Sequence, residues 1–360
     1  MIPVSILPDP AAFSGKHRHH NTAILFSPGP FGGAEQVVLS GIQSLEGVAL
    51  WIIEESRNPN PSIEFQTRCT ELGIEYKRFT CRSKFDPATL RKLIHEVRTN
   101  FIRLIHSHGM KANFYNSMLP VKRIATQHGK TSHNFKIRLL ESVEHLALMR
   151  MDRVVCVSES MFAASSYRKK ILIENFLSMK VRKDEYSTDG EIKLVCIGRL
   201  SFEKGIADLI HAIKRLPDEN ISLTLVGNGN QIAHIKEISS GMDNIQFAGF
   251  QKDISPYLIA ADALVMPSHR EGLPMALIEA TAAGLPVIAS DVGGIPTLVH
   301  ENGYLFESKN IDDIMDKIIR FKANRNEMNE KAKSYRQSVR RKYSLDTWVK
   351  STNGLYESLL

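Results

Sequence analysis

The chain has 360 residues, of which 43% are apolar and 24% are charged, proportions that fit a globular protein and exclude a chain disordered throughout. At about 150 residues per domain, this length predicts two domains. Lysine and arginine total 46 against 39 aspartates and glutamates. The resulting net charge of +7 allows an anionic partner, such as a phosphate-rich substrate or an acidic membrane face, without selecting one.

In the first half of the chain, short apolar runs alternate with helical patterns. The strands expected there are 22–26 (TAILF), 48–53 (VALWII), 104–106, 124–127 and 153–157 (RVVCV), and the helices include 34–45 and 90–98. This alternation is typical of a parallel sheet covered by helices on both faces.

The segment 179–191 (MKVRKDEYSTDGE) is polar and turn-prone, and it predicts a linker. The alternation then resumes, with strands expected at 192–197, 222–226, 245–247, 263–266 and 286–289, and a mostly helical end at 311–360 anchored by Trp348 and Tyr356. We therefore expect two doubly wound α/β domains. The first comprises residues 1–178 and the second 192–340, and a helix at 341–360 returns to the first domain.

The four cysteines, Cys69, Cys81, Cys156 and Cys196, form no C-x-x-C pair, which excludes zinc ribbons and thioredoxin-like redox sites. Scattered thiols fit a reducing compartment. No apolar run reaches the length of about 18 residues that spans a membrane, and the first ten residues lack the basic start of a signal peptide. We expect a cytoplasmic protein.

Open parallel sheets bind ligands beyond the carboxyl ends of their strands, so the loops that follow strands are the candidate sites. The first is 27–35 (SPGPFGGAE), in which Gly32 and Gly33 open a helix whose free N–H groups suit a phosphate or a sugar oxygen. A glycine-rich turn without a ligand is the alternative. The loop is neither G-x-G-x-x-G nor a Walker loop, which disfavours nicotinamide dehydrogenases and P-loop ATPases.

The second loop, 196–205 (CIGRLSFEKG), places Arg199 and Lys204 after a strand, where two cations can clamp a diphosphate. The alternative is an exposed basic loop. The third, 266–279 (MPSHREGLPMALIE), carries Glu271 in the loop and Glu279 one to two turns into the following helix. Two such carboxylates can orient sugar hydroxyls, or they can be a surface pair.

Histidines also follow strands of the first half, at His106 and His108 (HSHG) and at His128 (TQHGK). A lone histidine is more often a hydrogen-bonded structural residue than a functional one. Three in post-strand loops of one domain make at least one of them a candidate for function.

Together these loops resemble the family-4 glycosyltransferases, a retaining group with the GT-B architecture. The pieces that carry the resemblance are GGAE (32–35), HSHG (106–109), QHG (127–129), VVCVSES (154–160), EN (174–175), IGRLSFEKG (197–205), LVGNG (225–229), FAGF (247–250), 261–290 with its E-x7-E spacing, and GGIP (293–296). Their order and spacing extend from Thr22 to the C-terminal helix.

The resemblance implies a nucleotide-sugar donor held mainly by the second domain and an acceptor held mainly by the first. It assigns Glu271 and His128 to positions beside the donor sugar. The donor-binding residues that it implies are Gly33, Arg199, Lys204, Phe250, Gln251, Leu273, Pro274, Met275 and Glu279. On the acceptor side we expect Gly32, His108 and Lys130.

No Asp-x-Asp motif occurs in the chain, so Arg199, Lys204 and helix N-termini are expected to neutralise the leaving group without a metal or other cofactor. The resemblance implies retention of the donor's anomeric configuration, and same-face substitution is the expected route.

We expect UDP as the carrier, a hexose or N-acetylhexosamine as the sugar, and a glycan or lipid-linked acceptor of bacterial polysaccharide or lipopolysaccharide synthesis. Residues 130–138 carry three cations that can touch anionic lipid or form a solvated face.

Three other readings compete. A nucleotide-sugar epimerase of the same architecture would convert donor without acceptor, and the E-x7-E segment disfavours it. An inactive nucleotide-sugar-binding protein is disfavoured by the intact Arg199, Lys204, Glu271 and Glu279. Nucleic-acid binding is disfavoured because the basic excess is spread along the chain without an aromatic stacking platform.

Overall fold

The computed structural model describes residues 21–29, 32–83, 85–127, 135–177, 181–186, 190–216, 220–299 and 301–360, the side chains of 135–141 excepted. It separates into two compact units, residues 1–178 with 345–360 and residues 179–344. His128, Lys130 and the side chains of the basic stretch 130–138 lie outside the described residues.

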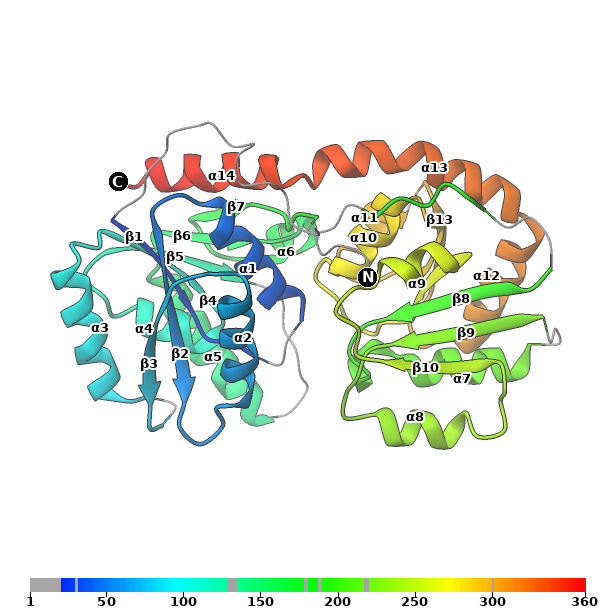
Figure 1. The fold of residues 1–360 in the computed structure, drawn as a ribbon, viewed down its shortest axis with the longest axis horizontal. Coiled ribbons are helices and arrows are strands. Elements are labelled where there is room, and N and C mark those ends of the chain that lie inside the picture. Colours follow the sequence, from blue (N-terminus) through cyan, green and yellow to red (C-terminus); the bar gives the residue numbers. More distant parts are fainter. Residues whose placement is uncertain are drawn as a thin grey trace. The chain divides into compact units, whose positions relative to one another are not determined.

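The first unit is built on a parallel sheet with the strand order β3-β2-β1-β4-β5-β6-β7 (Figure 1). The strands are β1 (Thr22–Phe26), β2 (Val48–Glu55), β3 (Tyr76–Cys81), β4 (Leu104–His108), β5 (Lys122–Gln127), β6 (Arg153–Cys156) and β7 (Lys170–Leu172). The helices are α1 (Gly33–Ser44), α2 (Asn60–Glu71), α3 (Pro87–Thr99), α4 (Met110–Asn116), α5 (Phe135–Met149), α6 (Glu159–Ala164) and α14 (Leu345–Glu357). All residues of the central strands β1 and β4 are buried, as expected for strands covered on both faces.

The second unit has the strand order β10-β9-β8-β11-β12-β13, again fully parallel. The strands are β8 (Ile192–Ile197), β9 (Ile221–Val226), β10 (Ile245–Gly249), β11 (Ala263–Met266), β12 (Val287–Ser290) and β13 (Gly303–Phe306). The helices are the 3-10 turn η2 (Phe202–Lys204), α7 (Ile206–Arg215), α8 (Ile232–Ile238), α9 (Ser255–Ala260), α10 (Met275–Ala283), α11 (Pro296–Val299), α12 (Ile311–Ala323) and α13 (Arg325–Lys342). The predicted pair of doubly wound sheets is confirmed.

Three strands were not predicted from the sequence, and all three are edge strands: β3, β7 and β13. β3 alternates buried and exposed residues in its second half, β7 has only three residues, and β13 begins with Gly303. An edge strand pairs on one side only, so it needs no continuous apolar run. The sequence pattern that revealed the central strands is therefore weak at these three edges, whereas the fourth edge strand, β10, was predicted at 245–247.

The stretch expected as a linker belongs, over residues 181–186, to the packed structure of the second unit. Val181 and Lys183 are buried there, and Tyr186 donates a hydrogen bond to the carbonyl of Gly284 at 2.8 Å. On α13, Arg336 and Arg340 donate to the carbonyls of Lys183 and Val181. Burial lowers the pKa of Lys183, whose ammonium donates to the carbonyl of Ile259 at 2.6 Å.

The C-terminal helix α14 groups with the first unit, while α13 before it runs on to Lys342 in the second (Figure 1). Trp348 packs its ring on Phe176, at 4.8 Å between centroids, and against the backbone of Gly41 on α1. Among the described helices, none combines the length and the apolar character needed to cross a bilayer.

Candidate active site

The carboxyl end of the second sheet brings together two loops that are far apart in the sequence. Lys204 closes the η2 turn after β8, and Glu271 lies in the loop between β11 and α10. The Lys204 ammonium forms an ion pair with Glu271 Oε1, and Ser268 Oγ donates to the same oxygen at 2.8 Å. The Glu271 side chain is only 10% exposed and that of Lys204 28% exposed, so the pair is largely shielded from solvent.

Glycines let these loops approach closely. Gly205 has a φ of +63°, and a Cβ there would lie 2.0 Å from the carbonyl oxygen of Pro267. Gly293 has a φ of +58°, and a Cβ there would lie 2.0 Å from the carbonyl oxygen of Glu271. These contacts fix the Lys204 turn and the GGIP loop against the backbone that carries Glu271.

A histidine–carboxylate pair that the sequence analysis missed ties the same loops together. His269 Nε2 lies 2.7 Å from Asp208 Oδ2 on α7, and the His269 backbone N–H donates to the carbonyl of Glu203 at 2.8 Å. Phe202 lies edge-on to the imidazole at 5.2 Å. Asp208 and His269 are 61 positions apart, so no local pattern could have joined them.

Other expected donor residues of the second unit lie in the loops at the same edge of its sheet. Arg199 is exposed directly after β8, and Phe250, 47% exposed, follows β10 beside Gln251, whose amide donates to the carbonyl of Ala248 at 2.7 Å. On the third loop, Pro274 is the N-cap of α10, and the helix begins at Met275.

Two further residues of this third loop are buried. Leu273 is 5% exposed and Glu279, on α10, is 8% exposed. Beneath the loops, burial raises the pKa of the Cys196 thiol to about 12, so this cysteine stays protonated at neutral pH and is no nucleophile.

In the first unit, the glycine-rich loop forms the start of α1 as expected. Gly32 is the N-cap and Gly33 the first helical residue, with no side chain capping the helix N–H groups. The buried Glu35 carboxylate accepts the backbone N–H of Gly29 at 2.9 Å and thereby steadies the loop. A helix N-terminus of this kind suits an anion.

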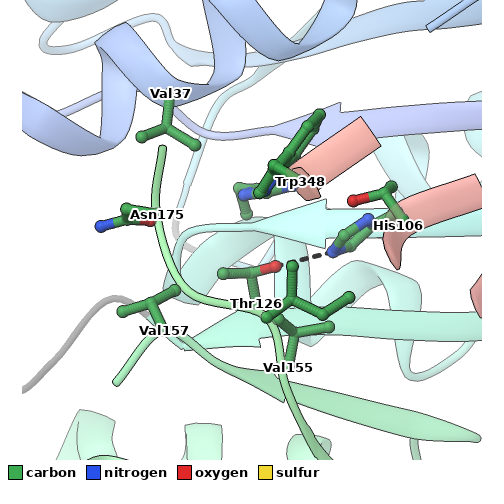
Figure 2. Close-up of a pocket in the computed structure, with 10 residues that line it drawn as sticks. Val37, His106, Thr126, Val155, Val157, Asn175 and Trp348 are labelled. Atoms are coloured by element: carbon green, nitrogen blue, oxygen red, sulfur yellow. Dashed lines mark hydrogen bonds between the residues drawn. The ribbon is translucent and has the colours of Figure 1, made fainter. Parts of the chain in front are cut away.

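The histidines of β4 face the interior of the first unit, as Figure 2 shows for His106. His106 Nε2 lies 2.7 Å from Thr126 Oγ1, and Nδ1 lies 2.9 Å from the hydroxyl of Tyr356 on α14. The ring of His108, 3% exposed, lies 4.5 Å from that of His106. Both histidines line an enclosed cavity of about 10 Å³, room for about one water molecule.

The structure thus brings Lys204 and Glu271 into contact and places Arg199, Phe250, Gln251 and Glu279 in the same compact unit. Gly32, Gly33 and His108 belong to the other compact unit.

Two family profiles match the chain, Glycosyltransferase Family 4 over residues 31–165 and Glycosyl transferases group 1 over residues 179–339. The chain therefore belongs to the family-4-like glycosyltransferases and is a transferase with the GT-B fold.

Individual proteins similar to this chain are also glycosyltransferases by name. An uncharacterised glycosyltransferase of Methanocaldococcus jannaschii is 26% identical over 73% of this chain and 77% of its own. The O-antigen biosynthesis glycosyltransferase WbnH of Escherichia coli is 36% identical over 36% of this chain and 38% of its own. Among solved structures, Anabaena HepE in complex with UDP and glucose has a TM-score of 0.81 at 18% identity, over 94% of this chain and all of that one.

Proposed function

We propose that the protein transfers a hexose or N-acetylhexosamine from a nucleoside-diphosphate sugar, with UDP as the carrier, to a hydroxyl of a glycan or lipid-linked acceptor. The observation that carries the proposal is the shielded Lys204–Glu271 pair at the carboxyl end of the second sheet. In the proposed site, Lys204 is the cation that meets the diphosphate and Glu271 is the carboxylate that meets the sugar.

The chemistry follows from the charge that develops on the departing nucleoside diphosphate. Lys204 and Arg199 offset that charge, and the start of α10 adds free N–H groups. Because these groups are cationic or dipolar and the chain has no Asp-x-Asp motif, we propose that no metal takes part. Activity is then expected to survive excess EDTA, and dependence on added Mg²⁺ or Mn²⁺ would contradict this part of the proposal.

The stereochemical course is proposed to be retention by same-face substitution. Glu271 and His128 would position the sugar, while an oxygen of the departing phosphate helps to remove the proton from the acceptor hydroxyl. Glu279 would hold the ribose, and Gly33 would approach the phosphates. On the acceptor side we propose Gly32 and Lys130. His108 is buried, and we propose that it supports this side without touching the acceptor.

The named relatives support a role in polysaccharide synthesis, since WbnH is an O-antigen biosynthesis enzyme. The complex of HepE with UDP and glucose supports UDP as the carrier. We propose that the protein works in the cytoplasm at the inner face of the membrane, where lipid-linked acceptors for such polymers are found.

A thermal-shift screen with UDP-, GDP-, ADP- and dTDP-sugars tests the donor site. A ligand at about one hundred times its Kd stabilises the folded state by about 2.7 kcal/mol, which gives a clear rise in Tm. We expect the rise with UDP-sugars.

The matched variants are Lys204→Ala and Lys193→Ala. Lys204 lies beyond the carboxyl end of β8, and Lys193 lies at its amino end. Lys204→Ala should reduce the Tm rise strongly, whereas Lys193→Ala, an exposed lysine at the amino end of β8, should keep it. No rise with any donor, or an equal loss in both variants, would overturn the donor site. Conversion of the nucleotide sugar without acceptor would point to an epimerase instead.

A further inference from the structure

Basic residues occupy the amino ends of four adjacent strands in the first unit. Strands β4 to β7 are neighbours in the sheet, and their amino ends therefore lie in a row about 4.8 Å apart. Each of them begins with, or directly follows, a cation: Arg103 before β4, Lys122 and Arg123 in β5, Arg153 in β6, and Lys169 and Lys170 at β7. Backbone bonds join neighbouring members, such as the Lys122 N–H to the carbonyl of Arg103 at 2.9 Å.

The fold itself does not require this row, as the second unit shows. Its sheet has the same parallel construction, but acids or amides precede five of its six strands: Glu191 before β8, Asn220 before β9, Asn244 before β10, Asp262 before β11 and Asn302 before β13. Pro286 precedes β12. Lys193 is the exception, one residue inside β8. A row of cations on four adjacent strands is therefore found in the first unit, whereas in the second unit Arg325 is buried against Asp262.

A groove of about 480 Å³ opens within this basic edge, between the start of β5 and the last residues of the chain. Its lining includes Arg103, Lys122 and Arg123 together with Asp152 and Leu360, and the Arg103 guanidinium donates to the Leu360 oxygen at 3.1 Å. The Nε of Arg123 is buried and has no hydrogen-bond acceptor among the described residues. Asp152 Oδ2 is 3.8 Å from that Nε and already accepts the Arg123 backbone N–H at 2.9 Å. The Arg123 Nε is closed off from solvent, but Lys122 is exposed in the lining, and its ammonium can donate to an anionic oxygen that enters the groove.

Exposed apolar side chains adjoin the cations. Among the large apolar residues of the described ranges, the three most exposed are Phe101 at 77%, Met149 at 65% and Leu146 at 63%. Phe101 lies two residues before Arg103 and has a φ of +53°, and Met149 is the last residue of α5. A hydrogen bond of 2.8 Å between His145 Nδ1 and the Tyr167 hydroxyl joins the end of α5 to the chain that enters β7.

We propose that this amino edge of the first sheet is a membrane-contact surface that docks on an anionic phospholipid bilayer, with a lipid phosphate in the groove. Cations alone would suit any polyanion, but exposed phenylalanine, methionine and leucine beside them suit a bilayer interface, where apolar side chains enter below the headgroups. The surface lies at the opposite end of the strands from the α1 loop, so docking leaves that loop accessible. The inference deepens the proposed membrane location, and it is tested by binding rather than by sugar transfer.

The experiment is co-sedimentation of the full chain with two kinds of vesicle: phosphatidylcholine alone, and phosphatidylcholine with phosphatidylglycerol in equal parts. We expect binding to the anionic vesicles only, with release at high salt. In the variant Lys122→Gln/Lys169→Gln, affinity should fall by about 25-fold, since a basic residue near an anionic surface contributes about 1 kcal/mol, or about five-fold.

The matched control, Lys193→Gln/Lys214→Gln, removes two exposed lysines of the second unit and should bind as the unaltered chain does. Phe101→Asn removes the apolar side chain but keeps a residue that tolerates a positive φ, and it should also weaken vesicle binding. Tm measurements confirm that each variant is folded.

Several results would overturn the proposal: no binding to anionic vesicles, equal losses in the two double variants, or unchanged binding by Phe101→Asn. Release of the protein from anionic vesicles by millimolar inorganic phosphate would also overturn the proposal, because it would indicate a site for free anions. Donor-induced Tm shifts are measured separately in the same variants. Failure of membrane docking is therefore distinguishable from failure of the transferase assignment.

Discussion

The two units share a doubly wound parallel sheet but hold their carboxyl-end loops by different means. In the second unit, loops pack backbone against backbone through glycines, and polar pairs such as His269–Asp208 join them. In the first unit, Trp348 and Tyr356 of the C-terminal helix α14 pack beside the sheet. His106 of β4 shares a hydrogen bond with the Tyr356 hydroxyl. The second site is thus organised by its own loops, whereas the first depends on a segment that arrives from the end of the chain.

The dependence of the first unit on α14 gives the largest expected effect. Trp348→Ala removes a ring that packs on Phe176 and the backbone of Gly41, and such losses cost about 3–5 kcal/mol. Hydrogen exchange followed by mass spectrometry should show reduced protection in β4 and β5 and unchanged protection in β8 and β9. The control Phe321→Ala, in the core of the second unit, should show the reverse pattern. An equal loss of protection in both units of Trp348→Ala would show that the dependence on α14 is not particular to the first unit.

The polar cluster of the second unit is tested by Glu271→Ala. If Glu271 contacts the donor sugar, transfer should fall by about 10²–10³-fold, the range seen when one preorganised polar contact to a transition state is lost. Glu307→Ala is the control, since it removes an exposed carboxylate that follows β13 at the same edge of the sheet. Steady-state kinetics with the donor found by thermal shift measure both. Full activity of Glu271→Ala would end its claim to the site.

Close loop packing in the second unit is tested by Gly205→Ala against Gly241→Ala. Both glycines have a positive φ, but a Cβ at Gly205 overlaps the carbonyl of Pro267, whereas one at Gly241 meets nothing within 4 Å. Overlap with backbone is not relieved by a rotamer change, so Gly205→Ala should cost about 1–3 kcal/mol more than Gly241→Ala. Urea denaturation measures the difference. Similar values for the two variants would mean that the loops are looser than the structure indicates.

Most of the fold and the loops of the candidate site could be predicted from the sequence, because central strands and strand-end glycines leave local patterns. The loops bearing Arg199, Lys204 and Glu271 were located in this way. The edge strands β3, β7 and β13 were missed because one-sided pairing relaxes the apolar pattern. The His269–Asp208 pair was missed for another reason. It joins residues 61 positions apart, and only the folded sheet brings them together.

The smallest effect concerns a helix cap that titrates in the first unit. Asp86 caps α3 by accepting the N–H of Ala88 at 2.9 Å, while the corresponding cap of α12 in the second unit is Asn310, an amide. The backbone N–H of Arg82, followed by that of Ala88, holds the pKa of Asp86 below its ordinary value despite partial desolvation. A lowered folded-state pKa means that this stabilisation is present above the ordinary aspartate pKa of about 3.9 and is lost as the pH falls through the folded value.

Asp86→Asn makes the cap of α3 resemble that of α12, since asparagine caps helices about as well as aspartate. The amide keeps an acceptor for the Ala88 N–H but puts an NH2 donor where Oδ2 accepts the Arg82 N–H at 3.2 Å, so the Tm at pH 7 should fall modestly. The drop in Tm between pH 5 and pH 3 should be smaller than in the unaltered chain. Asp86→Ala should lower the Tm at pH 7 because the cap is lost outright. An acid profile of Asp86→Asn identical to that of the unaltered chain would place the acid sensitivity of the first unit in other carboxylates, and would remove this difference between the two units.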